Sequence, residues 1–183
     1  MNSTALQTFE HAIQDSIDLL DHFDHLNKTP PPPPEAEVLK RASLVMALAA
    51  LETYIEDRIT EAADSVVGYA GGHGRLGTFY KKSLESDLKY FHTPSTDRIK
   101  AIFSKFLNID VTDGWNWNHY DPARACSELN RIAKKRGDIA HRSLRPLPGK
   151  TDPHAVTRDE LRKNIRFIRD LVSATDAFVG KSL

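Results

Sequence analysis

The chain has 183 residues, of which 40% are hydrophobic and 27% charged, which is typical of a globular domain with a substantial core. Its 25 basic and 25 acidic residues cancel, which excludes nucleic-acid coating by an overall positive charge and leaves only local basic clusters for such contacts. Cys126 is the single cysteine, which excludes an internal disulfide. No apolar run approaches the about 20 residues that a membrane helix needs. We therefore expect a cytoplasmic protein without a signal peptide.

Two long helices are predicted in the first third of the chain. Apolar residues three and four positions apart predict the first helix over residues 5–26. Pro30–Pro34 follow, and we interpret this run as a spacer between helices rather than a partner-docking motif. The second helix is expected over residues 35–67, with Gly68 ending it. The residues expected on its buried face are Val38, Ala42, Val45, Leu48, Ile55 and Ile59.

One carboxylate, Glu52, falls on the apolar stripe of this second helix, between Leu48 and Ile55. A carboxylate in such a place is costly unless it is paired. Two interpretations stay open: Glu52 reaches solvent or a core tyrosine from the edge of the stripe, or it holds Arg136 or His141 in a functional site.

The middle of the chain is predicted to contain a loop and two shorter helices. Gly68–Gly77 is rich in glycine, but no strand precedes it and no Gly-Lys-Ser/Thr follows, so we expect a loop without phosphate-binding function. The two helices are predicted over residues 79–91 and 97–106. The segment His92–Ser95 separates them, because the residue before a proline disfavours helical geometry.

The last third is predicted to hold an irregular segment and two more helices. For Trp115 and Trp117 we favour anchoring to the core or to a subunit interface over stacking on bases. Asp121 is expected to cap the fifth helix, with Pro122 at its first position, and a capping box begins the last helix at Thr157. No strand pattern is found, so the predicted fold class is all-α.

The most informative segment ends the fifth helix and reads Arg-Gly-Asp-Ile-Ala-His over residues 136–141. A guanidinium binds phosphate oxygens in a bidentate manner, and an imidazole transfers protons near neutral pH. Together they are the minimum needed to cut a phosphodiester without a metal. The alternative is a helix end whose basic residues favour the macrodipole. The surrounding basic residues are Arg131, Lys134, Lys135, Arg142 and Arg145.

Metal chemistry has little support in this sequence. His22 and His25 lie three residues apart, but no third ligand is evident, so we expect neither a metal site nor a cofactor.

Two segments resemble the HEPN superfamily, and within it the RiboL-PSP-HEPN type: Ala-Leu-Glu-Thr-Tyr-Ile-Glu-Asp at residues 50–57 and Lys-Arg-Gly-Asp-Ile-Ala-His-Arg at residues 135–142. The resemblance runs from the second helix to the last. It implies one HEPN-like domain over residues 1–183, a bundle of about five or six helices with a long second helix, and a homodimer whose Arg/His motifs face a shared cleft. Many members are metal-independent endoribonucleases, often toxins or effectors in toxin–antitoxin and phage-defence systems, and some are inactive binding modules.

The resemblance also implies site residues. Arg136 and His141 match the arginine and histidine that carry cleavage, and Asp138 is the polar residue between them. Family members often have Asn, Asp or His directly after the arginine, whereas this chain has Gly137 there. We expect Asp138 or Glu52 to orient the catalytic pair. The residues expected to bind RNA are Lys134, Lys135 and Arg142.

We therefore expect an RNA endonuclease that leaves 2′,3′-cyclic phosphate and 5′-hydroxyl ends. His141 acts as base on the ribose 2′-hydroxyl or as acid toward the leaving 5′-oxygen, Arg136 stabilises the transition state, and His141 of a second subunit takes the complementary proton role. Two alternatives stay open. One is a non-catalytic interaction module for a protein partner such as an antitoxin, and the other is a regulatory module that binds a nucleotide without cutting it.

Overall fold

The structure is a computed structural model that describes residues 2–28, 36–70, 74–142 and 155–183. These residues contain no strand, which confirms the all-α prediction; a single bridge joins Trp117 and Tyr120. The elements are α1 (Thr4–Leu26), α2 (Glu37–Tyr69), α3 (Arg75–Leu88), α4 (Thr96–Leu107), the short 3-10 helix η1 (Val111–Gly114), α5 (Pro122–Arg142) and α6 (Arg158–Ser182).

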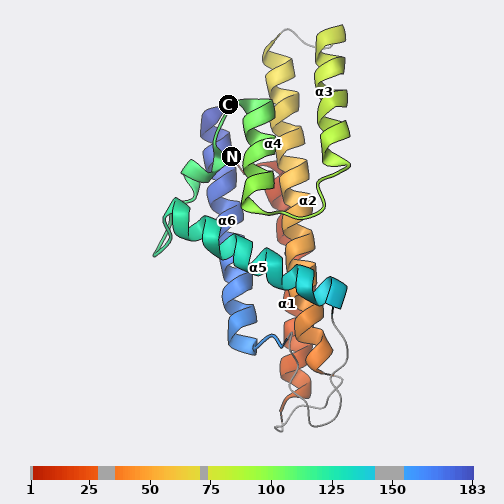
Figure 1. The fold of residues 1–183 in the computed structure, drawn as a ribbon, viewed down its shortest axis with the longest axis vertical. Helices are drawn as coiled ribbons and strands as arrows, with labels where there is room; N and C mark the ends of the chain where they lie inside the picture. Colours follow the sequence, from red (N-terminus) through yellow and green to blue (C-terminus); the bar gives the residue numbers. More distant parts are fainter. Residues whose placement is uncertain (1, 29–35, 71–73, 143–154) are drawn as a thin grey trace.

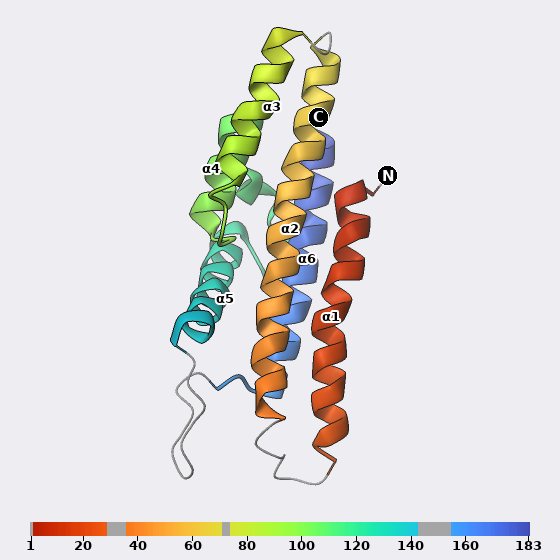
Figure 2. The ribbon, with the colours of Figure 1, turned by 90° about the vertical axis from the view of Figure 1, so that its right-hand side faces the viewer.

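Helix α2 is the centre of the bundle and packs against all five other α-helices. The long helices α1, α2 and α6 run side by side, and α3, α4 and α5 lie on the side of α2 away from α1 (Figure 2). Helix α5 crosses the bundle obliquely (Figure 1). This arrangement leads the end of α5, with the Arg136 segment, across α2 (Figure 1).

The buried face of α2 differs from the predicted one near its start. Leu48, Ile55 and Ile59 are fully enclosed as expected, but the prediction for Val38 is wrong, because its side chain is 49% exposed. In the first turns α2 contacts only part of the bundle, and its buried side turns toward α1. There Ser43 Oγ donates a 2.7 Å hydrogen bond to the Ser16 carbonyl, and the Lys40 ammonium lies 4.4 Å from the centroid of the Phe23 ring.

The helix ends follow the predicted capping residues. The Asp121 carboxylate accepts a 2.9 Å hydrogen bond from the backbone N–H of Arg124, and the Thr157 hydroxyl accepts one of 3.2 Å from Glu160. Helix α2 continues through Gly68 and α3 starts at Arg75, so the glycine-rich connection is shorter than the predicted loop. Pro30–Pro34 lie outside the described residues.

The irregular segment before α5 is attached to α6. Trp115 is fully buried, and its Nε1 donates a 2.9 Å hydrogen bond to the Thr175 hydroxyl. Gly114 packs so closely on Phe178 that a Cβ at this position would lie 2.4 Å from the Phe178 Cβ. The anchoring interpretation therefore holds for Trp115, and this attachment places the start of α5.

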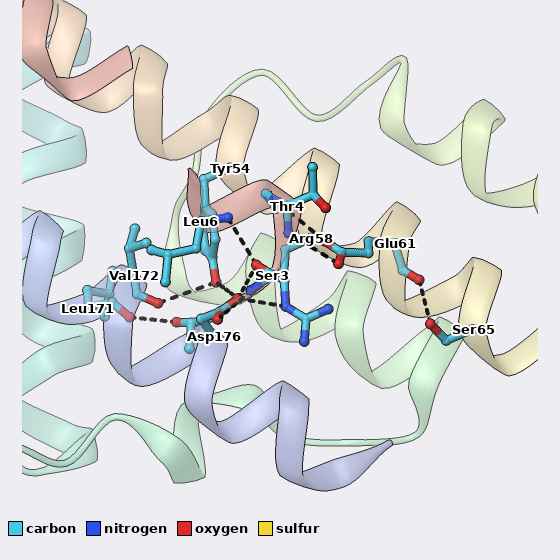
Figure 3. Close-up of polar contacts among 12 residues, drawn as sticks. Ser3, Thr4, Leu6, Tyr54, Arg58, Glu61, Ser65, Leu171, Val172 and Asp176 are labelled. Carbon is cyan, nitrogen blue, oxygen red and sulfur yellow. Dashed lines mark hydrogen bonds and ion pairs between the residues drawn. The ribbon is translucent and has the colours of Figure 1, made fainter. Parts of the chain in front are cut away.

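A buried polar cluster joins the beginning of α1 to α2 and α6 (Figure 3). Arg58 Nε lies 3.0 Å from Asp176 Oδ1, and their side chains are only 5% and 8% exposed. The backbone N–H of Ser3 donates to Asp176 Oδ2 at 3.3 Å, and the Tyr54 hydroxyl donates to the Val172 carbonyl at 3.3 Å. These contacts hold the three long helices together at one end of the bundle.

Candidate active site

Helix α5 runs without interruption through the Arg136 segment to Arg142. In a continuous α-helix, residues five positions apart differ by about 140° around the axis. Arg136 is half-buried and belongs to the apolar face of the helix, together with the buried Ile132 and Ile139. His141 is exposed. Arg136 and His141 therefore do not share one face of α5, and a sector of the helix surface lies between them.

Two small residues, Gly137 and Ala140, lie next to Arg136 and His141 in the sector between them. By helical geometry Ala140 lies about 40° and Gly137 about 100° from Arg136 around the axis. No heavy atom lies within 4 Å of the position that a Cβ on Gly137 would occupy. The helix surface is therefore open between the guanidinium and the imidazole, which leaves room for a substrate to approach both.

Glu52 of α2 faces this end of α5. Burial raises the pKa of Glu52, and the charges of Arg136, His92 and Arg98, in decreasing order of effect, oppose that rise. The Arg136 Nε is buried and has no hydrogen-bond partner. Glu52 and Arg136 thus lie within electrostatic reach of each other, but no hydrogen bond or ion pair joins them in the described residues, so the role of Glu52 stays a prediction. The buried tyrosine nearest in sequence, Tyr54, instead bonds to the Val172 carbonyl on α6.

Asp138 follows Arg136 by two positions on α5 and is half-buried. It lies three residues before His141, a spacing at which helical side chains are neighbours. Among the described residues, however, Asp138 forms no hydrogen bond or ion pair with His141. An orienting role for Asp138 therefore has no contact to support it, and for Glu52 the support is the electrostatic effect of Arg136 on its carboxyl group.

The basic cluster on α5 is partly neutralised by acidic residues. Lys135 Nζ lies 2.8 Å from Glu160 Oε2 on α6, and Arg131 lies 3.0 Å from Glu160 Oε1 and 2.8 Å from Glu128 Oε1. Burial would raise the pKa of Glu160, but Lys135 and Arg131 hold it below its usual value. Lys135 is thus engaged in a link between α5 and α6, and Lys134 is the exposed lysine of this segment. The Arg142 side chain and Arg145 lie outside the described residues.

Two residues near Glu52, namely Glu56 on α2 and Arg98 on α4, were not among the predicted site residues. Burial and the charges of Glu52 and Asp57 raise the pKa of Glu56, and His92 opposes that rise as it does for Glu52. Arg98, on the first turn of α4, donates through Nη1 to the Tyr90 carbonyl at 3.3 Å. The only sequence feature near Arg98 that could be read in advance was the break between the two short helices, and such a break predicts a turn rather than a functional site.

A pocket of about 620 Å³ lies between the 117–120 loop, α5 and α6. Trp117 stacks on Tyr120 with ring centroids 5.2 Å apart, and Phe167 completes this aromatic wall. Two donors at its lining, Trp117 Nε1 and Asn164 Nδ2, are buried and have no hydrogen-bond partner. Both atoms are closed off from solvent, so Trp117 acts here mainly as a packing residue.

A family model for RiboL-PSP-HEPN matches residues 11–181, which include the Arg136 segment and Glu52. The chain belongs to the RiboL-PSP-HEPN family. Neither a curated protein nor a solved structure matches it significantly. Membership is consistent with a ribonuclease or nucleotide-related function, and HEPN domains often bind RNA and dimerise.

Two further observations concern this RiboL-PSP-HEPN domain. In the described residues no group of three or more His, Cys, Asp and Glu side chains is placed to hold a metal ion. His22 and His25 therefore belong to no such group. None of the described helices is both long and apolar enough to cross a membrane.

Proposed function

We propose that this RiboL-PSP-HEPN protein is a metal-independent endoribonuclease that acts as a toxin or effector in bacterial defence. The observation that supports this proposal most strongly is the open surface over Gly137 and Ala140, bordered by Arg136 and His141. A phosphodiester at this place has a guanidinium on one side and an imidazole on the other. In this proposal Glu52 on α2, which lies within electrostatic reach of Arg136, orients the guanidinium.

In the proposed reaction His141 removes the proton from the ribose 2′-hydroxyl, and the 2′-oxygen attacks the phosphorus. Arg136 stabilises the negative charge that develops on the non-bridging oxygens. The bond between phosphorus and the 5′-oxygen breaks, and that oxygen takes up a proton. The products are a 2′,3′-cyclic phosphate and a 5′-hydroxyl, because the internal 2′-oxygen is the nucleophile.

We further propose a two-fold homodimer in which the two Arg136 segments face a shared cleft. The exposed side chains of Lys134 and His141 lie on neighbouring positions of the α5 surface, about 20° apart around the axis. Together they offer a charged face at the end of α5 suited to an RNA backbone. Lys134 and Arg142 bind the RNA in this proposal, whereas Lys135 contributes less because Glu160 neutralises it.

The experiment is cleavage of a short RNA by the purified wild type and by the variants His141→Ala and Arg136→Ala. Arg136→Ala should lower the rate about 10²–10³-fold, the scale for losing one donor to transition-state charge. His141→Ala should abolish cleavage. Matched controls are His22→Ala on α1 and Arg124→Ala at the start of α5, both exposed, which should cut like the wild type.

The substrate and the buffer supply the second half of this test. Cleavage should persist in EDTA, and RNA with a 2′-O-methyl group at the cut site should resist, because its nucleophile is blocked. A wild type that needs a divalent metal, or that cuts the methylated RNA as fast as ordinary RNA, contradicts the mechanism.

A second candidate function, a non-catalytic module for a protein partner, is favoured by one apolar surface. Tyr69 at the end of α2 and Leu76 and Phe79 on α3 are 81%, 81% and 71% exposed. They lie where α2 and α3 project beyond the rest of the bundle (Figure 1). Exposed apolar patches often mark interaction sites. A purified wild type that cuts no RNA, but whose partner binding is lost in Leu76→Asp, would favour this function.

A further inference from the structure

The pocket between the 117–120 loop, α5 and α6 has an aromatic wall made of three side chains in mutual contact. The ring centroids of Trp117 and Tyr120 lie 5.2 Å apart, and the Phe167 centroid lies 5.7 Å from that of Trp117 and 5.1 Å from that of Tyr120. Phe167 is buried, whereas Trp117 and Tyr120 remain half-buried at the pocket lining. The wall therefore presents ring surface to the pocket, and a flat group can stack on it.

The loop that carries two of these rings is fixed by its own backbone. The N–H of Trp117 donates to the Tyr120 carbonyl at 3.1 Å, and the N–H of Tyr120 donates to the Trp117 carbonyl at 2.7 Å. His119 has a φ of 66°, which is uncommon for a residue with a Cβ, and its carbonyl accepts a 3.4 Å hydrogen bond from Arg124 Nη1. The two rings are thus positioned before a ligand arrives, which lowers the cost of ordering them on binding.

The lining also holds two hydrogen-bond donors to which the chain offers no acceptor. Asn164 is fully buried, and its Oδ1 accepts a 2.7 Å hydrogen bond from Arg131 Nη2. Because a guanidinium can only donate, this bond fixes the orientation of the amide and leaves Nδ2 as the free donor. Within the described residues, neither this Nδ2 nor Trp117 Nε1 has a partner. Buried donors without an acceptor are costly, so a ligand with acceptor atoms is favoured. Solvent reaches neither nitrogen, so the ligand has to shift side chains at the lining as it enters.

The charges of the pocket favour a nucleobase over a free anion. The lining contains four carboxylates and three cations besides His119, so a phosphate ion would meet an excess of negative charge. A base instead carries ring or carbonyl acceptors for the unpaired donors and N–H groups for the carboxylates. Lys163 and Arg166 on α6 are exposed, three positions apart and without an ion pair in the part of the chain that the structure describes. They can hold the phosphates on either side of a bound base.

The pocket lies on the side of α5 that leads to His141. Arg131 lines the pocket, and by helical geometry Lys134 lies about 60° and His141 about 80° from it in the same direction around the axis. Along the axis, His141 lies about 15 Å beyond Arg131. An RNA strand cut at His141 can therefore pass the exposed Lys134 and place in the pocket a base that is a few nucleotides away from the cut.

We propose that this pocket is a base-binding subsite, which takes one unstacked base of a single-stranded RNA substrate a few nucleotides away from the cut bond. The base stacks on the ring of Trp117, its acceptor atoms meet the unpaired donors, and Lys163 and Arg166 hold the neighbouring phosphates. The inference rests on the proposed ribonuclease function and deepens it, because it makes the substrate a single strand whose bases are free to leave the stack. The two tryptophans of the segment then differ in role: Trp115 anchors the loop to α6, and Trp117 receives the substrate.

The test measures binding rather than cleavage, on the full-length His141→Ala protein, which should leave the RNA uncut. Its ligands are a single-stranded RNA, whose cut site is mapped separately with the wild type, and copies in which one base at a time is replaced by an abasic sugar. One abasic position that is not adjacent to the cut bond should weaken binding about 5–150-fold, the scale of one stacked base. When Trp117→Ala is added, the same abasic position should cost less than about two-fold, because the stack is already lost.

The fluorescence of Trp117 gives a second readout. Trp115 is fully buried and hydrogen-bonded to Thr175, so RNA should quench the emission of the protein that has both tryptophans through Trp117. Trp117→Phe keeps a ring for stacking, so it should bind RNA within a few-fold of the parent protein and lose the quenching. This variant keeps the test decisive if Trp117→Ala fails to fold.

Control variants separate the pocket from the rest of the surface. Phe79→Ala removes a ring that is 71% exposed on α3, and Arg169→Ala removes an exposed arginine of α6. Neither residue lines the pocket, so both variants should bind RNA like the parent protein. Arg166→Ala, at the rim of the pocket, should weaken binding several-fold.

Four results decide between the possibilities. The inference is overturned if no abasic position costs more than about two-fold, if the cost persists in Trp117→Ala, or if Arg166→Ala binds like Arg169→Ala. Cleavage by a wild type that shows none of this coupling leaves the proposed ribonuclease function standing without the subsite. Coupling in a protein whose wild type cuts no RNA overturns the ribonuclease function and supports the base site alone.

Discussion

The guanidinium of Arg136 on α5 is the strongest of the three charges that oppose the burial-driven rise in the pKa of Glu52 on α2. We expect Glu52→Gln to lower kcat for RNA cleavage more than it changes KM, because Arg136 then loses the carboxylate that positions it. Steady-state kinetics measures this split. An unchanged kcat would show that Arg136 keeps its place without Glu52.

Glu52→Gln should also change how the stability of the protein depends on pH. A carboxyl group whose pKa is raised by folding contributes stability below its unfolded value, and this contribution is lost as the pH rises through the folded pKa. Glu52→Gln removes the titration. Its unfolding midpoint relative to wild type should therefore increase as the pH rises above the usual glutamate value of 4.5. Thermal unfolding at a series of pH values measures the difference, and a difference that falls with pH would contradict it.

Gly137 is predicted to lower the stability of α5 while leaving space for the RNA substrate. A helix-interior glycine costs roughly 0.5–1 kcal/mol relative to alanine, and a Cβ at Gly137 would meet no atom within 4 Å. Gly137→Ala should therefore raise the unfolding midpoint while slowing RNA cleavage, because the methyl group enters the open helix surface between Arg136 and His141. The matched control is Gly68→Ala on α2, where a Cβ also meets nothing within 4 Å and RNA is not expected. Equal cleavage by both variants would argue against substrate over Gly137.

The link between α5 and α6 should weaken in acid. The pKa of Glu160 lies below its usual 4.5 because Lys135 and Arg131 outweigh the effect of burial. A lowered pKa contributes stability above the unfolded value, and this is lost as the pH falls through the folded pKa, so the window lies below about 4.5. Glu160→Gln should be less stable than wild type by about 1 kcal/mol at pH 7, and the gap should close in acid. Urea unfolding at pH 7 and at low pH measures both values.

The buried pair of Arg58 and Asp176 should be worth much more than a surface pair. Removing one member of a buried ion pair leaves an uncompensated charge and costs about 3–5 kcal/mol. We expect this loss for Arg58→Ala in urea unfolding. The control is Arg169→Ala, whose 3.0 Å pair with Glu10 is about half exposed and should contribute less than about 1 kcal/mol. Similar losses in both variants would contradict the role of the cluster shown in Figure 3.

The proposed dimer predicts a particle of twice the chain mass of 20.6 kDa at micromolar concentration. Sedimentation equilibrium measures it. Lys134→Glu places a negative charge on each side of the proposed cleft, so it should weaken both self-association and RNA binding. A monomeric wild type with intact cleavage would rule out the shared cleft, and both proton transfers would then have to come from a single chain.

The local patterns of the sequence were sufficient for the all-α class and for the order of the six α-helices. Helical periodicity, the cap at Asp121 and the capping box at Thr157 depend on neighbours a few residues away, and the structure confirms them. The Arg136 segment could be identified for a related reason, since its residue types and spacing are visible in one stretch of chain. Val38 shows the limit of such patterns, because the face of a helix that is buried depends on which helices pack against that part of it.

The surroundings of the Arg136 segment were decided by the tertiary structure alone. Lys135 was predicted to bind RNA from its place in the basic cluster, whereas the structure places the carboxylate of Glu160, 25 residues further along the chain, 2.8 Å from its ammonium. Charge pairing and burial depend on which distant segments meet. A sequence therefore determines which side chains are available for chemistry, and only the packing of the helices decides which of them are neutralised, which are exposed and which act together.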